Sequence, residues 1–313
     1  MKIVFLEIGN LGDDLDFEQF KELGEVEFYE TTPDELVTER IGDADVVAIN
    51  KIPMNRETLE NAPNVKLICV TATGTNNIDF DYVNSRGIQV ANVSSYSTDT
   101  VVQHTFAMAF YLLEKLAYYD KYVKSGEYMD SPYFVHMGRS FHDLKSLTWG
   151  IVGLGEIGRG VADIAKAFGS RVIYYSTSGK NNQSRYERVS LEQLLKESDI
   201  VSIHAPLNET TENLFRYEVF RMMKPTAVLL NLGRGPIVND KDLARALQEN
   251  LIGGAGLDVL SVEPMAKNSP LAAIQDSERL LITPHIAWAS VEARTRLVNR
   301  VYENIKDFKN TLK

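Results

Sequence analysis

A glycine-rich turn between two apolar runs constrains the fold of this chain more than any other feature. The run from Leu147 to Val152 ends in Gly153-x-Gly155-x-x-Gly158, and a helical pattern follows directly. A second apolar run, Arg171–Tyr175, comes next, so strand, turn, helix and strand fit within about thirty residues. The alternative is a helix start that contains glycines by chance. Because a strand stands on each side of the motif, we favour a dinucleotide site.

Each glycine has its own expected role in such a turn. Gly153 permits the tight bend, Gly155 lets the backbone approach a pyrophosphate, and Gly158 lets the helix pack closely on the strand. Unpaired N–H groups in the first helical turn, which contains Glu156 and Ile157, then face the phosphates.

Apolar runs alternate with helical patterns along nearly the whole chain, which indicates parallel sheets covered on both faces. The runs before the glycine turn, expected to form one sheet, are Lys2–Leu6, Val26–Tyr29, Asp45–Ile49, Lys66–Val70 and Gln89–Val93. The runs after it, expected to share its sheet, are Ile200–His204, Ala227–Asn231, Gly256–Val259 and Leu280–Thr283. The last helical pattern, Val291–Phe308, could join either sheet.

A long helix and an irregular segment lie between the two groups of strands. The helix is expected from about Thr100 to Ser125, and its first half is apolar nearly all round, which indicates burial or an interface. The segment from Tyr128 to Asp143 has no period and is expected to form an extended arm. Its tyrosines and those before it could be core aromatics, but we favour a dimer contact.

Composition excludes several classes of function. The chain has 33 basic and 43 acidic residues and a formal charge of -10, which disfavours nucleic acid and anionic membranes as partners. No apolar run approaches the ~18 residues of a membrane span, and the first residues do not resemble a signal peptide. Cys69 is the only cysteine, and no histidines and acids stand at metal-ligand spacing, so we expect no metal site. We expect a cytoplasmic protein.

Three residues that can carry chemistry follow strands of the glycine-turn sheet. Ligands of doubly wound sheets bind beyond the carboxyl ends of the strands, where Arg234, Glu263 and His285 are expected. A carboxylate beside an imidazole stabilises its protonated form, which makes it a usable acid near neutral pH. The planar guanidinium of arginine suits a substrate carboxylate. A surface arginine and a structural histidine are the alternatives for each residue taken alone.

The chain resembles the D-isomer-specific 2-hydroxyacid dehydrogenase family over essentially its full length. The segments that carry this resemblance are Gly153–Gly158, His204–Leu207, Asn231–Gly235, Asp258–Pro264 and Pro284–Trp288. The segments Val70–Asp79 and Tyr96–Thr105, with Trp288, are similar to the glycerate dehydrogenase (hydroxypyruvate reductase) branch.

The resemblance implies an α/β protein of two doubly wound parallel-sheet domains. A flavodoxin-like substrate domain would comprise residues 1–97 and 289–313. A Rossmann dinucleotide-binding domain would comprise residues 98–288, with a dimerisation helix and arm at about 100–145. The substrate would bind in a cleft between the domains, whose closure is expected.

The resemblance also implies roles for individual residues. His285 would donate a proton to the carbonyl oxygen of the substrate, Glu263 would orient His285, and Arg234 would hold the substrate carboxylate. The backbone N–H groups of Thr73 and Gly74 would bind the same carboxylate, and Lys51 could reach the substrate or simply be an exposed lysine. Asp258 would bind the nicotinamide carboxamide and Val101 would pack on its ring. The complete expected cofactor set is Val101, Gly153, Gly155, Glu156, Ile157, Gly158, Ser176, Thr177, Ala205, Pro206, Leu232, Gly233 and Asp258.

One position departs from the family pattern. Ser176 closes the second strand of the glycine unit, where the family usually has an acid that binds the ribose hydroxyls of the adenosine. Serine does not repel a 2′-phosphate, and Lys180 could attract one. Both NAD and NADP therefore remain candidate cofactors.

The expected function is reduction of a small 2-keto acid, hydroxypyruvate or glyoxylate first, to the D-2-hydroxy acid by a homodimer. A D-lactate or a branched or aromatic 2-hydroxyacid dehydrogenase is an alternative within the family. A non-catalytic, corepressor-like dinucleotide sensor is an alternative of another class. His204 is interpreted as structural and His104 as a packed core histidine.

Overall fold

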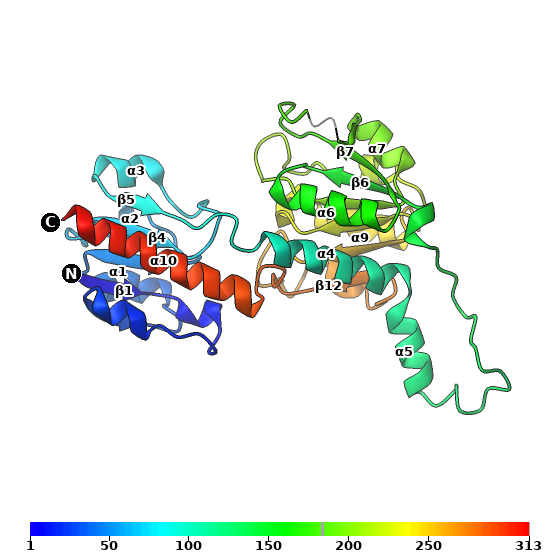
Figure 1. Cartoon of the computed structure of the whole chain (residues 1–313), viewed down its shortest axis with the longest axis horizontal. Helices are drawn as coiled ribbons and strands as arrows, with labels where there is room; N and C mark the ends of the chain where they lie inside the picture. Colours follow the sequence, from blue (N-terminus) through cyan, green and yellow to red (C-terminus); the bar gives the residue numbers. More distant parts are fainter. Residues whose placement is uncertain (183–184, 313) are drawn as a thin grey trace. The chain divides into compact units, whose positions relative to one another are not determined.

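The structure is a computed structural model that describes residues 1–182 and 185–312. The chain divides into two compact units, one formed by Met1–Ser97 with the residues from Ala289 onward and the other by Thr98–Trp288. Each unit has its own parallel sheet with helices on its faces (Figure 1). No helix within the described residues is long and apolar enough to span a bilayer.

The first unit contains a five-stranded sheet in the order β2-β1-β3-β4-β5. Its strands are β1 (Lys2–Phe5), β2 (Glu25–Phe28), β3 (Val46–Ile49), β4 (Leu67–Val70) and β5 (Gln89–Ala91). Its helices are α1 (Val37–Ile41), α2 (Arg56–Leu59), α3 (Phe80–Ser85) and α10 (Val291–Thr311), with short 3-10 turns at Ile8–Leu11, Glu18–Glu22 and Asp34–Leu36. All strand pairs are parallel, and the order is that of a flavodoxin-like sheet.

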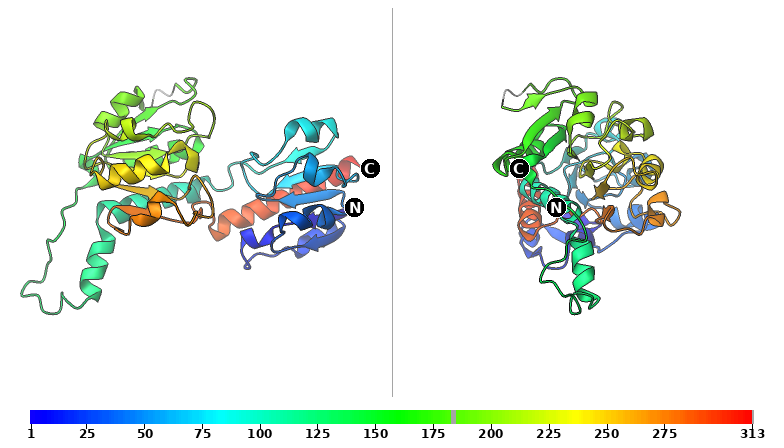
Figure 2. Two further views of the ribbon diagram at one scale, coloured as in Figure 1. Left: turned by 180° about the vertical axis from the view of Figure 1, so that it is seen from behind. Right: turned by 90° about the vertical axis from the view of Figure 1, so that its right-hand side faces the viewer.

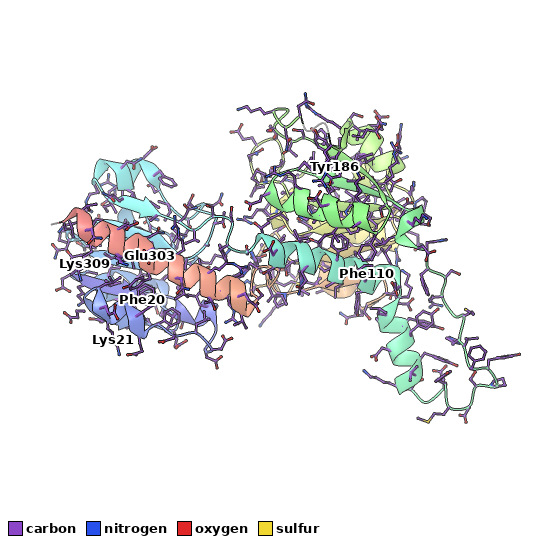
Figure 3. All side chains as sticks on the ribbon, viewed as in Figure 1. Phe20, Lys21, Phe110, Tyr186, Glu303 and Lys309 are labelled. Atoms are coloured by element: carbon purple, nitrogen blue, oxygen red, sulfur yellow. The ribbon has the colours of Figure 1, made fainter. Side chains whose placement is uncertain are left out.

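The C-terminal helix α10 completes the first unit. It packs against β4, and its apolar stripe includes Leu297, Val301 and Ile305. The buried ring of Phe20 connects sheet and helix, because its centroid lies 4.8 Å from that of Phe5 and 5.7 Å from that of Tyr302 (Figure 3).

The second unit contains a seven-stranded parallel sheet in the order β12-β11-β10-β9-β6-β7-β8. Its strands are β6 (Thr148–Val152), β7 (Arg171–Tyr175), β8 (Glu187–Arg188), β9 (Ile200–Ile203), β10 (Val228–Asn231), β11 (Gly254–Leu257) and β12 (Leu280–Ile282). Its helices are α4 (Thr98–Leu113), α5 (Leu116–Lys124), α6 (Glu156–Ala167), α7 (Leu191–Glu197), α8 (Tyr217–Phe220) and α9 (Asp240–Gln248), with 3-10 turns at Leu144–Ser146, Gly235–Ile237 and Pro270–Ala273. The order reverses between β6 and β9, as in a Rossmann sheet. The predicted fold class is therefore confirmed.

Helices cover both faces of this sheet (Figures 1 and 2). Strand residues alternate between the faces, so Trp149 and Ile151 pack under α4 and α6 while Val152 joins the opposite core with α7 and α9. Phe110 of α4 and Phe168, which follows α6, extend the first core, with ring centroids 5.5 Å apart (Figure 3). The two-sided burial explains why the central strands are continuously apolar in sequence.

The expected long helix is wrong in one respect. It is two helices, α4 and α5, because Lys115 has a left-handed backbone with a φ of 55°. Helix α5 and the segment 125–143 then extend from the body of the second unit (Figure 2). The segment returns along α5, where the His136 ring stacks on Tyr122 at a centroid distance of 3.7 Å and bonds the Tyr118 hydroxyl at 2.7 Å.

Candidate active site

His285 and Glu263 form a hydrogen-bonded pair beyond two neighbouring strands. His285 follows β12 and Glu263 follows β11, and His285 Nδ1 lies 2.8 Å from Glu263 Oε2. Glu263 Oε1 also accepts the Leu260 backbone N–H at 2.9 Å. Because the carboxylate accepts from Nδ1–H, the ring orientation is set and Nε2 is the outward nitrogen. His285 Nε2 bonds no described residue, and the side chain remains 28% exposed.

The backbone at His285 is held in an uncommon conformation. Its φ is +56°, in the left-handed region that non-glycine residues rarely adopt. Asp258, which is 2% exposed, accepts the Ile286 and Ala287 N–H groups, each at 2.9 Å, while the Asp258 carbonyl accepts the His285 N–H at 2.9 Å. The residue expected to bind the carboxamide thus also holds the turn that carries His285.

Arg234 leaves β10, the strand on the other side of β11. It is half-buried, and its Nη1 donates to the Gly233 carbonyl at 2.9 Å. Close backbone packing explains the glycines beside it, because a Cβ at Gly235 would lie 1.8 Å from the Leu260 carbonyl oxygen. The sheet therefore brings Arg234, Glu263 and His285 to three adjacent strand ends.

The glycine turn after β6 has the geometry that a pyrophosphate requires. Gly153 has a φ of +91°, and a Cβ at Gly158 would lie 2.2 Å from the Gly153 carbonyl oxygen. Gly155 is the N-cap of α6 without a side-chain cap, and a Cβ there would meet nothing within 4 Å. The turn thus leaves open space in front of the first N–H groups of α6, which contains Glu156 and Ile157, so these residues fit a dinucleotide.

The carboxyl end of β7, where an adenosine ribose would bind, contains no acid at position 176. Ser176 is buried and its Oγ has no hydrogen-bond partner within the described residues. Lys180 is exposed. The Arg188 side chain of β8 reaches toward Gly179, since its Nη2 would lie 4.0 Å from a Cβ atom added to that glycine. Neither Lys180 nor Arg188 forms an ion pair with a described residue. The sequence reasoning missed Arg188, because the two-residue strand β8 has no recognisable pattern.

Of the other expected cofactor residues, five follow strands of the second unit's sheet and one, Val101, lies in α4; the five are Thr177, Ala205, Pro206, Leu232 and Gly233. Val101, Ala205, Leu232 and Gly233 are buried, Thr177 is half-buried and Pro206 is exposed. Ala205 touches the glycine turn, because a Cβ at Gly153 would lie 2.9 Å from its backbone. His204 precedes it at the end of β9; both of its ring nitrogens are buried without a partner among the described residues, and burial lowers its pKa to about 3.

In the first unit, the expected substrate residues follow β3 and β4. The N–H groups of Thr73 and Gly74 donate to no described residue. The Lys51 side chain is exposed, and its ammonium group bonds no described residue. The Glu7 carboxylate holds the loop that presents Lys51, since its Oε2 accepts the N–H groups of residues 50, 51 and 52 at 2.8, 2.8 and 3.0 Å. Sequence reasoning missed Glu7, for which an acid directly after the first strand was the only signal.

Comparison with known proteins identifies the family. A model described as D-isomer specific 2-hydroxyacid dehydrogenase, NAD binding domain, matches residues 106–287. The chain belongs to the D-isomer specific 2-hydroxyacid dehydrogenase family. It is 35% identical to a glycerate dehydrogenase of Methylorubrum extorquens, with 98% of this chain and 96% of the relative covered. It is 36% identical to a hydroxypyruvate reductase of Blautia hydrogenotrophica, with coverages of 98% and 97%.

A solved structure has the same fold. An acyclic imino acid reductase in complex with NADPH and D-Arg superposes with a TM-score of 0.87 at 29% identity, covering 99% of this chain and 98% of that one. As a member of this dehydrogenase family, the protein is an oxidoreductase that acts on a CH–OH group with a nicotinamide dinucleotide. Within the described residues, no cluster of three or more His, Cys, Asp or Glu is arranged to hold a metal ion.

Proposed function

We propose that this dehydrogenase reduces a small 2-keto acid, hydroxypyruvate or glyoxylate, to the D-2-hydroxy acid with His285 as the proton donor. The observation that carries the proposal is the 2.8 Å contact of His285 Nδ1 with Glu263, which leaves Nε2 directed away from the carboxylate. The names of the curated relatives, glycerate dehydrogenase and hydroxypyruvate reductase, favour these substrates over larger keto acids.

In this mechanism the protein supplies charge and geometry. A reduced nicotinamide held by the expected cofactor residues would supply the hydride for C2 of the keto acid. Glu263 keeps the His285 ring in one orientation, with Nδ1 toward the carboxylate. His285 Nε2–H donates its proton to the carbonyl oxygen as negative charge develops there, and the ring is left neutral. Arg234 binds the substrate carboxylate with its planar guanidinium.

Steady-state oxidation of the reduced cofactor tests this proposal. We expect turnover with hydroxypyruvate or glyoxylate, and we expect His285→Ala to lower kcat by about 10²–10⁴-fold with a much smaller change in KM. His142→Ala is the matched control, because His142 lies exposed in the arm. An unchanged kcat in His285→Ala would remove this residue from the chemistry. A panel with pyruvate and branched or aromatic keto acids separates the alternatives within the family.

We also propose that Lys51 and the N–H groups of Thr73 and Gly74 bind the substrate. The Lys51 ammonium and these two N–H groups donate to no described residue, which supports this assignment, since a carboxylate needs such partners. Lys51→Ala is then expected to raise KM for the keto acid more than it lowers kcat. An equal KM in the variant and the parent would assign Lys51 to the solvent-exposed surface alone.

We propose that the enzyme accepts NADPH. Support comes from serine instead of an acid at position 176, and from Lys180 and Arg188, which form no ion pair with a described residue. The test is kcat/KM for both cofactors in the parent and in Arg188→Ala, which should lower the NADPH value selectively. A preference for NADH above about a hundredfold, roughly 2.7 kcal/mol, would refute this proposal.

We propose that the arm forms a homodimer contact. Three large apolar side chains of the arm are almost fully exposed, which is unusual for a monomeric protein. They are Met129, Phe134 and Met137, at 86%, 88% and 83% exposure. Sedimentation of the parent should give a dimer, and Phe134→Asp with Met137→Asp should give a monomer. A monomeric parent would refute it.

A further inference from the structure

A hydrogen-bonded network behind His285 extends to helix α4. Asp258 Oδ1 accepts the Thr283 hydroxyl at 2.6 Å and the Ile286 N–H at 2.9 Å. His104, on α4, places its Nε2 3.1 Å from Thr283 Oγ1 and 3.6 Å from Asp258 Oδ1. The expectation that His104 is a packed core histidine is therefore wrong, because its ring has polar partners and is 20% exposed.

The direction of each bond follows from the proton inventory. Ionised Asp258 can only accept, so the single hydroxyl proton of Thr283 points toward it. The Thr283 oxygen then offers a lone pair to His104, whose Nε2 must carry the hydrogen and donate it. The chain of donors runs from His104 through Thr283 to Asp258.

We propose that His104 is a positioning residue that acts on His285 through Thr283 and Asp258. This inference rests on the proposed role of His285 as proton donor. The bonds end at Asp258, whose carboxylate fixes the N–H groups of the residues that follow His285. His104 therefore does not transfer a proton to substrate. It holds the Thr283 hydroxyl toward Asp258 and thereby restrains the left-handed turn at His285.

Two variants that remove this restraint should act on the same step. We expect His104→Phe and Thr283→Val each to lower kcat about tenfold, since small displacements of a reacting group are costly, with KM for the keto acid nearly unchanged. The double variant should lose about tenfold rather than about a hundredfold, because both changes break one chain of bonds. His104→Gln should restore most of kcat, since its amide N–H can donate to Thr283. Additive losses, or no rescue by His104→Gln, would overturn the proposal.

Amide hydrogen exchange in the cofactor-free protein gives a readout that is independent of turnover. His104→Phe should accelerate exchange at Ile286 and Ala287 about tenfold, and His104→Gln should return it toward the parent rate. Thr105→Val is the control, because Thr105 is the next residue of α4 and is fully buried, and among the described residues its hydroxyl donates only to the Val101 carbonyl, at 2.7 Å. Parent-like exchange in His104→Phe, or equal acceleration in Thr105→Val, would refute the positioning role. A parent enzyme that reduces no keto acid would refute the proposed function alone, because the exchange experiment still decides the role of His104.

Discussion

Replacement of Asp258 by asparagine tests whether its carboxylate holds the turn at His285 before any cofactor binds. The side chain keeps its shape but exchanges one oxygen for an NH2 group. Oδ1 accepts the Ile286 N–H and Oδ2 accepts the Ala287 N–H. In either orientation of the amide, one of these backbone donors therefore faces another donor.

The expected loss can be estimated from this single broken contact. A hydrogen bond to a charged group contributes about 1.5–3 kcal/mol, and removal of the buried charge returns part of its desolvation cost. We expect a net loss of about 2 kcal/mol in the free energy of unfolding. For a unit of this size, that loss lowers Tm by about 4–8 °C. Because the turn is loosened, kcat should fall as well.

Thermal unfolding of the cofactor-free protein is the assay, followed by kcat and by the Kd of the reduced cofactor. Asp199→Asn is the matched control. Asp199 accepts hydrogen bonds from the Thr148 N–H at 2.9 Å and from the Lys224 ammonium at 2.8 Å. These contacts lie at the amino ends of the strands of the same sheet. That variant should lose stability but keep kcat, because β9 begins at its next residue, far from the strand ends that carry the site.

A cofactor-free Asp258→Asn protein with the parent Tm, or a higher one, would refute this reasoning. The buried carboxylate would then not stabilise the cofactor-free protein, and its only role would be to bind the nicotinamide carboxamide. Weaker cofactor binding at unchanged Tm would support that other account.

Three further outcomes follow from the described contacts. Gly158→Ala should cost about 1–3 kcal/mol in urea unfolding, because its Cβ would lie 2.2 Å from the Gly153 carbonyl oxygen; an unchanged midpoint contradicts the close packing. Glu7→Gln should raise KM for the keto acid about threefold at constant kcat, because a neutral amide holds the loop 50–52 less strongly; a changed kcat contradicts this. Burial lowers the pKa of His204 to about 3 in the folded protein. As pH falls below about 6.5, this histidine is therefore protonated in the unfolded chain but not in the folded protein, and the free energy of unfolding decreases. Between pH 7.5 and 5.5 the parent should lose about 1.4 kcal/mol more than His204→Gln; equal losses would show that His204 is protonated in the folded protein.

Local sequence determined the architecture of both sheets. Continuous apolar runs separated by helical patterns are typical of strands that are buried on both faces in parallel sheets, and every described strand except β8 lies within one or two residues of a run. The same pattern predicts that Arg234, Glu263 and His285 emerge at one edge, since parallel strands have their carboxyl ends together. The glycine turn is predictable for a related reason, because a φ of +91° at Gly153 demands that residue type.

Tertiary structure alone decided the contacts that hold this site in place. His104 and Thr283 are 179 positions apart, and Glu7 meets the loop at Asn50 across 43 positions. The break at Lys115 and the two-residue strand β8, which pairs with β7, also lack a local signal. Helical and strand periods reflect which face of an element is buried, whereas the partner of a single polar group depends on the packing of distant elements. For this reason the positions of Arg234, Glu263 and His285 after three adjacent strands could be predicted from the chain itself, whereas the contacts of His104 and Glu7 could not.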